Sequence, residues 1–315
     1  MNAAEPPASG RVVDAAELPQ LLAAAGLEAA DVDAVIQRAL AEDIDGGVDV
    51  TTVATVPVDQ RATLELRARQ AGTLAGVPVA AAVFAAVAAA DGARVHLRTD
   101  HWDGDQVAVG AIALAITGPV HVLLRGERPA LNLLGHLSGV ATATHAWVLA
   151  IAGTDAQVRD TRKTTPGLRR LEKYAVRCGG GTNHRMSLAD AALVKDNHVV
   201  AAGGVRQAFA AVRDRFPGVP VEVEVDSLDQ LVEVLDAGAD LVLLDNFTID
   251  QLRQAVQITA GRARLEASGG LSLNVAQAVA STGVDYLAVG ALTHSAPVLD
   301  IGADLREEDG SAAGD

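Results

Sequence analysis

The pattern of apolar and polar positions changes near residue 150. Before it, "LEAADVDAVIQRALAED" and "RPALNLLGHLSGVATATHAWVLAI" repeat apolar residues at helical spacing, whereas "ATLELRARQ" and "ARVHLRTD" alternate as half-exposed antiparallel strands do. This part of the chain therefore predicts an α+β domain.

After residue 150, short apolar strands alternate with helical segments. The predicted strands are "AQVRD", "AALVKD", "VPVEVEVD", "DLVLLDN", "ARLEASGG" and "DYLAVGALTHS". Such a rhythm indicates a parallel sheet with helical crossovers. Two units, "LDAGADLVLLDN" and "ASTGVDYLAVGA", share a glycine at the end of a helix, Gly238 and Gly283, which suits a left-handed backbone. The repetition favours a barrel built from βα units, with its chemistry at the carboxyl ends of the strands.

Carboxylates gather at two of those strand ends. In "VEVEVD" the period of two places Glu222, Glu224 and Asp226 on one face, which we expect to point into the barrel. Asp245 and Asn246 end the next strand. Carboxylates on adjacent strands can hold sugar hydroxyls or Mg²⁺. The alternative is a structural ion-pair network with nearby Lys and Arg residues.

Glycines follow the last two predicted strands and indicate a phosphate site, because they let backbone N–H groups approach an anion. The candidate residues are Ser268, Gly269, Gly270, Gly290 and His294. By itself the triplet Ser268-Gly269-Gly270 is a weak indication of a phosphate site, because most such triplets form turns.

Cations are concentrated in one stretch of an acidic chain. The 315 residues carry a formal charge of −15, yet residues 157–200 hold nine Lys and Arg against four Asp and Glu. A surplus confined to one segment favours a small anion over a nucleic acid as partner. The cations expected at the strand ends are Arg162, Lys163, His184, Arg185 and Lys195. Arg169, Arg170, Lys173 and Arg177 fall on a predicted helix, where most are expected to be solvated.

The remaining features limit the class of protein. No secretory signal pattern begins the chain, and its longest apolar run, "VAAAVFAAVAAA", is too short to span a bilayer and predicts a buried helix. The single cysteine, Cys178, suits a reducing compartment, and a packing role is favoured over a nucleophile. We therefore expect a cytoplasmic protein. "EDIDGGVDVTT" lacks the spacing of a calcium loop and predicts a helix end followed by a turn.

The motifs "TRKTTPG", "EKYAVRCGGGTNHR", "LVKDNH", "EVEVD", "LLDN", "EASGG" and "ALTHSAP" occur in this order. From about residue 30 to 302 the chain resembles the quinolinate phosphoribosyltransferase family, also called nicotinate-nucleotide pyrophosphorylase (carboxylating). The resemblance implies transfer of a phosphoribosyl group from phosphoribosyl pyrophosphate to quinolinate, with loss of CO₂. Both substrates are polyanions, which would explain the cluster of cations. Ser187 departs from the glycine common in relatives, which bears on the local loop conformation.

The resemblance also implies roles for single residues. Arg162, His184 and Arg185 would bind quinolinate, and Arg128 would reach the site of a neighbouring subunit. Lys163, Lys195 and His294 would lie near the pyrophosphate or a substrate carboxylate. Glu224 and Asp245 would hold the ribose hydroxyls and Mg²⁺, directly or through water, while Ser268, Gly269, Gly270 and Gly290 would bind the 5′-phosphate. Lys163, Lys195, Glu224 and Asp245 form the expected catalytic set, with Mg²⁺ and no organic cofactor.

Pattern and resemblance together predict the fold class and the assembly. We expect an N-terminal α+β sandwich domain over residues 26–148 and an open, incomplete TIM-like α/β barrel over 149–296. Residues 1–25 are expected to be disordered, and 297–315 to return to the N-terminal domain before a disordered tail. The expected unit is a homodimer, with assembly into a hexamer left open. Two alternatives remain: a transferase of this fold with another acceptor, and a non-catalytic protein that senses phosphoribosyl ligands.

Overall fold

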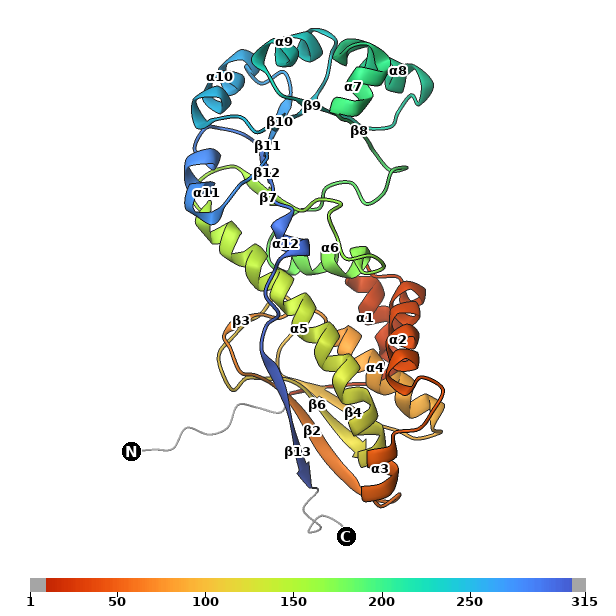
Figure 1. Ribbon diagram of the computed structural model, residues 1–315. Helices are drawn as coiled ribbons and strands as arrows, with labels where there is room; N and C mark the ends of the chain where they lie inside the picture. The colour runs from red at the N-terminus through yellow and green to blue at the C-terminus, as the bar shows by residue number, and fades with distance from the viewer. Residues whose placement is uncertain (1–9, 308–315) are drawn as a thin grey trace, which may run out of the picture. The chain divides into compact units, whose positions relative to one another are not determined.

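The computed structural model describes residues 10–307, which form two compact units (Figure 1). Of these residues, unit 1 holds 10–142, 170–178 and 296–307, and unit 2 holds 143–169 and 179–295. Helix α5 (Val120–Ala150) runs from one unit into the other.

Unit 1 is built on an antiparallel sheet whose strand order is β1-β4-β6-β2-β13. Its strands are β1 (Arg11–Val13), β4 (His96–Thr99), β6 (Ile112–Pro119), β2 (Arg61–Ala68) and β13 (Ile301–Glu307). A separate pair joins β3 (Gly72–Thr73) to β5 (Gln106–Val107). The C-terminal strand β13 pairs with β2, so the last described segment belongs to this sheet.

Helices cover the sheet of unit 1 in layers. They are η1 (Ala15–Glu17), α1 (Leu18–Ala24), α2 (Ala29–Ile44), α3 (Val50–Thr55), α4 (Val77–Ala90), the first part of α5, and α6 (Arg169–Cys178). Helix α4 contacts β6, and α1 and α2 contact α4 in turn. The alanine-rich run predicted as a buried helix is α4, and its Phe84 is fully buried. The segment predicted as a helix end and turn runs from the end of α2 to Asp49, whose side chain caps α3.

Two expectations fail in unit 1. The prediction of disorder over residues 1–25 is wrong for 10–25, which hold β1, η1 and α1; residues 1–9, like 308–315, lie outside the described part of the chain. Most of α6 groups with unit 1, although its residues were assigned to the barrel domain. Of the cations on that helix, Lys173 is fully buried, whereas Arg170 and Arg177 are exposed as expected. Lys173 is buried because α6 packs within unit 1 despite its position in the sequence.

Unit 2 contains an all-parallel sheet with strand order β7-β12-β11-β10-β9-β8. Its strands are β7 (Gln157–Arg159), β12 (Tyr286–Ala288), β11 (Arg264–Ser268), β10 (Leu241–Asp245), β9 (Val221–Val225) and β8 (Ala192–Val194). The connecting helices are α7 (Asp196–Ala202), α8 (Val205–Arg215), α9 (Leu228–Asp236), α10 (Ile249–Thr259), α11 (Leu273–Ala280) and α12 (Ala291–His294). Figure 1 shows α7 to α11 following one another around the outside of the sheet.

The strand order is that of a barrel that does not close. Within the described residues, β7 and β8 are the two edges of the sheet, and a single bridge between Arg159 and Thr182 extends β7 towards the gap. Gly238 and Gly283 have φ of +85° and +95°, as the repeated units predicted. The expected α/β fold with an open barrel is therefore confirmed. Among the described helices, none is both long and apolar enough to cross a membrane.

Candidate functional site

Two neighbouring cavities lie at the carboxyl ends of the parallel strands of unit 2. One, of about 420 Å³, is lined by Arg162, Lys163, His184, Arg185, Lys195, Glu224, Asp245, Glu266 and Ser268, together with Thr161, Leu193, Leu243 and Ala288. The other, of about 480 Å³, is lined by Lys163, Asp245, Asn246, Ser268, Gly269, Gly270, Gly290 and His294, together with Thr161, Leu271, Ala288, Val289 and Ala291. They share residues such as Lys163, Asp245 and Ser268. All predicted site residues except Arg128 thus line one continuous region, which we call the catalytic cavity.

Arg162 and Arg185 bring two guanidinium groups into the catalytic cavity without a carboxylate partner. Among the described residues neither forms an ion pair, and Nε of Arg162 is buried without a hydrogen-bond partner. Burial lowers the pKa of Arg185, and the charge of Arg162 lowers it further. Two close, unneutralised cations repel each other unless an anion lies between them. This corner of the cavity is therefore suited to a carboxylate or phosphate.

Two buried polar groups fix the segment that carries Arg185. The Asp160 carboxylate, at the end of β7, accepts hydrogen bonds from the His184 N–H at 2.9 Å and from Asn183 Nδ2 at 2.5 Å. His184 Nδ1 accepts a hydrogen bond from the Arg185 N–H at 2.7 Å. Since Nδ1 is an acceptor, Nε2 carries the proton of the ring and donates it to Glu222 Oε2 at 2.6 Å. His184 was predicted to bind substrate, and its ring also anchors the loop to β9.

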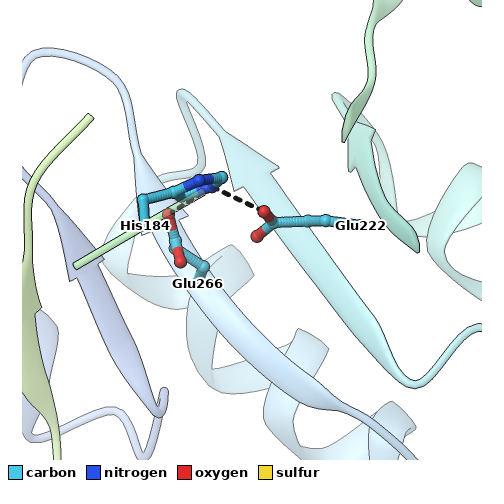
Figure 2. A group of neighbouring side chains, drawn as sticks. All are labelled: His184, Glu222 and Glu266. Carbon is cyan, nitrogen blue, oxygen red and sulfur yellow. Dashed lines mark ion pairs between the residues drawn. The ribbon is translucent and has the colours of Figure 1, made fainter. Parts of the chain in front are cut away.

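A pair of buried carboxylates lies beneath His184 (Figure 2). Glu222 and Glu266 are 3% and 0% exposed, and Glu266 Oε1 lies 3.6 Å from His184 Nε2. Arg159 of β7 donates to Glu266 Oε2 at 2.5 Å and stacks over the Tyr286 ring. Burial and the charge of Glu222 raise the pKa of Glu266 to about 7. This network joins β7 and the segment that carries His184 to strands β9 and β11 of the sheet.

The sequence indicated only part of this network. Glu222 was expected to point into the barrel with Glu224, whereas Arg159, Asp160 and Glu266 were not singled out. The same alternation predicted for "VEVEVD" applies to "RLEAS", where Glu266 shares a face with Ser268, so a signal for Glu266 was present. Asp226 is exposed and lines neither of the two cavities.

Glu224 and Asp245 project from adjacent strands in the manner expected for a site that holds hydroxyls or Mg²⁺. Lys195 Nζ donates to Glu224 Oε2 at 2.6 Å, and the Asn246 amide donates to Asp245 Oδ2 at 2.7 Å. Burial and the charge of Glu224 raise the pKa of Asp245. The two side chains line the same cavity from adjacent strands. Oxygen ligands of this kind fit Mg²⁺, which binds through one or two carboxylates and substrate phosphates.

A second set of metal-ligating atoms includes two residues that line the first cavity, His184 and Glu266. One atom each from His184, Glu222 and Glu266 lies within 4.8 Å of the others. His184 Nε2 already donates to Glu222, and Arg159 neutralises Glu266. These protein cations satisfy much of the charge of the group, so we assign it a structural role.

The glycine-rich end of the cavity depends on close backbone approach. Gly269 has φ of +93°, and a Cβ there would lie 2.8 Å from the Asn246 backbone nitrogen. A Cβ at Gly290 would lie 3.0 Å from Lys163 Cδ, whereas one at Gly270 would face open space. The Thr293 hydroxyl donates to the Lys163 carbonyl at 2.9 Å and joins this end to the cationic loop. Backbone N–H groups at such a turn can surround a phosphate.

Arg128 lines neither of the two cavities and is on the part of α5 that belongs to unit 1. Its side chain is 64% exposed, and its ion pair with Glu127 is loose, at 3.8 Å. The side chain is therefore free to meet another molecule, as its predicted role across a subunit interface requires.

An open parallel barrel whose strand ends combine unpaired cations, carboxylates and a glycine-rich cradle defines an α/β enzyme for phosphorylated and carboxylated substrates. The profile of the quinolinate phosphoribosyl transferase N-terminal domain matches residues 49–138, and that of the C-terminal domain matches residues 140–304. The chain belongs to the quinolinate phosphoribosyltransferase family.

Individual relatives agree with this assignment. The nicotinate-nucleotide pyrophosphorylase [carboxylating] of Mycobacterium leprae (strain TN) is 53% identical over 273 residues, which covers 86% of this chain and 95% of the relative. The quinolinate phosphoribosyltransferase [decarboxylating] 1b of Nicotiana tabacum is 36% identical, covering 88% and 83%. The crystal structure of NadC from Streptococcus pyogenes is 42% identical, with a TM-score of 0.84, and the match covers 88% of this chain and 97% of that one.

Proposed function

We propose that this protein transfers the phosphoribosyl group of phosphoribosyl pyrophosphate to quinolinate and releases nicotinate mononucleotide, pyrophosphate and CO₂. One observation carries the proposal: Arg162 and Arg185 lie without ion-pair partners in a cavity that continues into a glycine-rich cradle. Two anionic substrates that react with each other need two anion sites that adjoin. The names of the relatives support this reaction.

The cavity can bind the two substrates at opposite ends. Arg162 and Arg185 line the end suited to the two carboxylates of quinolinate, with His184 holding Arg185 in place. Ser268, Gly269, Gly270 and Gly290 form the end suited to the 5′-phosphate, beside His294. Asp245 lines both cavities and Glu224 lines the first, where they can accept hydrogen bonds from the ribose hydroxyls. Lys163 lines both cavities and can contact the pyrophosphate.

The reaction follows from the charges in this arrangement. The bond from ribose C1 to the pyrophosphate oxygen breaks, and C1 acquires oxocarbenium character that Glu224 and Asp245 stabilise. Lys163 and Lys195 neutralise the charge on the departing pyrophosphate. The pyridine nitrogen of quinolinate then bonds to C1 and becomes cationic. The neighbouring carboxylate leaves as CO₂, its electron pair remains on the ring carbon beside the cationic nitrogen, and that carbon takes a proton from water. Positioning and electrostatics therefore account for catalysis without a protein nucleophile or an organic cofactor.

Glu224 and Asp245 would hold a Mg²⁺ ion, directly or through water. When bound, the ion supplies positive charge next to the pyrophosphate. The two carboxylates fit it because they lie on adjacent strands, are partly buried and line the same cavity.

The proposed active unit is a homodimer in which Arg128 enters the cavity of the partner subunit. Its exposure and its loose contact with Glu127 support this role. Assembly of dimers into a hexamer and the cytoplasmic location both remain predictions from the sequence.

The test is an assay of the purified protein with quinolinate, phosphoribosyl pyrophosphate and Mg²⁺, following pyrophosphate and nicotinate mononucleotide together. We expect equal amounts of both products, and no product when nicotinate replaces quinolinate. Turnover of another acceptor in place of quinolinate, or binding of both substrates without release of pyrophosphate, would contradict the proposal.

A further inference from the structure

Unit 2 contains another large cavity, at the amino ends of its strands. It has a volume of about 630 Å³, and its lining includes the first residues of four strands, Val221, Leu241, Arg264 and Tyr286. We call it the distal cavity, because it shares no lining residue with the catalytic cavity. Its volume lies within the range of about 300–1,000 Å³ that is usual for small-molecule sites.

Three arginines and one carboxylate line the distal cavity: Arg159, Arg213, Arg264 and Asp240. Among the described residues, neither Arg213 nor Arg264 has an ion pair. Arg159 is paired with Glu266 through one nitrogen, but its Nε is buried without a hydrogen-bond partner. In a protein with a formal charge of −15, a cavity that gathers cations in excess of carboxylates is suited to an anion.

Aromatic contacts orient these guanidinium groups. Arg159 stacks at 4.1 Å over the Tyr286 ring, and Arg213 lies 5.4 Å from the centre of the Phe209 ring. Arg264 Nη1 donates to the Tyr286 hydroxyl at 2.5 Å, so the same ring holds two of the arginines. A guanidinium that lies against a ring keeps its N–H edge available for the paired oxygens of a phosphate.

We propose that the distal cavity binds a diphosphate group through Arg213, Arg264 and Arg159. Arg213 and Arg264 supply two cations without ion pairs for the diphosphate, with the guanidinium of Arg159 beside them, and the volume leaves room for a further moiety. Two sources present this chemistry, inorganic pyrophosphate and the diphosphate of a nucleotide.

The proposal is tested by calorimetric titration of the full chain with inorganic pyrophosphate, in the absence of Mg²⁺. The proposed function predicts one site in the catalytic cavity, and the distal cavity adds a second, so we expect two sites per chain. The double variant Arg213→Gln, Arg264→Gln should lose the distal site or bind pyrophosphate there at least tenfold more weakly. Lys163→Gln should weaken the other, because Lys163 is the residue proposed to contact pyrophosphate in the catalytic cavity, and should leave the distal site intact. Arg253→Gln, on the exposed surface of α10, is the matched control and should leave both.

The outcomes separate this inference from the proposed function. A single site that is lost in Lys163→Gln and unchanged in the double variant overturns the distal site and leaves the function standing. A single site that is lost only in the double variant supports the distal site and counts against the catalytic one. If the double variant does not fold, Arg213→Gln alone, on the exposed face of α8, should weaken the distal site at least threefold. The same titration with ADP then identifies the source, since a tighter distal site for ADP indicates a nucleotide.

Discussion

At the scale of single residues, the catalytic cavity combines two arginines that have no ion pair with carboxylates that are paired with cations. Arg162 and Arg185 remain unpaired, while Glu224 is held by Lys195, and Glu222 and Glu266 are held by His184 and Arg159. The motifs predicted residues that line the cavity, because the sequences of these loops are specific. They did not predict Arg159 and Glu266, since pairing between residues 107 positions apart depends on the folded sheet.

Replacing Arg162 or Arg185 by alanine should lower kcat/KM for quinolinate at least about a hundredfold, because each cation is aimed at substrate charge. Removing either also removes repulsion between the two, so the melting temperature should stay unchanged or rise. Steady-state kinetics and calorimetry measure both quantities. Arg253→Ala is the control on the surface, and near-normal kcat/KM in both cavity variants would refute the proposed site.

The pKa of Glu266, raised to about 7, makes a distinct contribution to the pH dependence of stability. The unfolded chain loses this proton near pH 4.5 and the folded chain only near pH 7, so the folded state binds more protons in between. Stability from this group therefore falls as pH rises from about 4.5 to 7. The variant Glu266→Gln has no proton to lose at this position, so its stability should lack this fall. The free energy of unfolding of the native protein minus that of the variant should therefore decrease as pH rises across this range.

Urea unfolding at several pH values measures the difference between the two proteins. Glu233→Gln, which alters an exposed carboxylate on α9, controls for the change in net charge. A difference that is constant with pH would show that Glu266 is ionised throughout.

At the scale of elements, the pattern of apolar residues predicted the six parallel strands of unit 2 and the buried helix α4. The sequence did not predict the short strand β1 or the packing of α6 in unit 1. Three residues carry too little periodicity to identify a strand, and an amphipathic helix does not reveal which core its apolar face meets. Such assignments depend on contacts between distant parts of the chain.

Close packing of α4 against α5 gives a test at this scale. A Cβ at Gly126 would lie 2.6 Å from Cδ1 of the fully buried Phe84. Gly126→Ala should therefore destabilise the protein by about 1–3 kcal/mol through overpacking, even though alanine favours helix. Gly47→Ala is the matched control, because its Cβ would meet nothing closer than 3.4 Å. Equal urea midpoints for the two variants would contradict this account of the packing.

At the scale of the whole molecule, the proposed dimer can be tested by mixing inactive chains. Arg128→Ala and Lys163→Ala should each abolish most activity. After co-refolding at equal amounts, half of the dimers should contain one chain of each kind, and one of their two sites would have both residues intact. Activity should therefore return to about one quarter of the native value. No recovery despite subunit exchange, verified by native mass spectrometry, would place Arg128 in its own subunit or outside the site.

The return of the chain to unit 1 has a consequence for its synthesis. Strand β2 pairs on one side with β6 and on the other with β13, which begins only at Ile301. A ribosome adding about 5–20 residues per second needs roughly 10–50 seconds to pass from β2 to β13. During that time one edge of β2 exposes unpaired backbone groups, the condition that favours association between nascent chains. The finished protein protects this edge with β13, where Asp304 and Arg306 place charges beside the last row of hydrogen bonds.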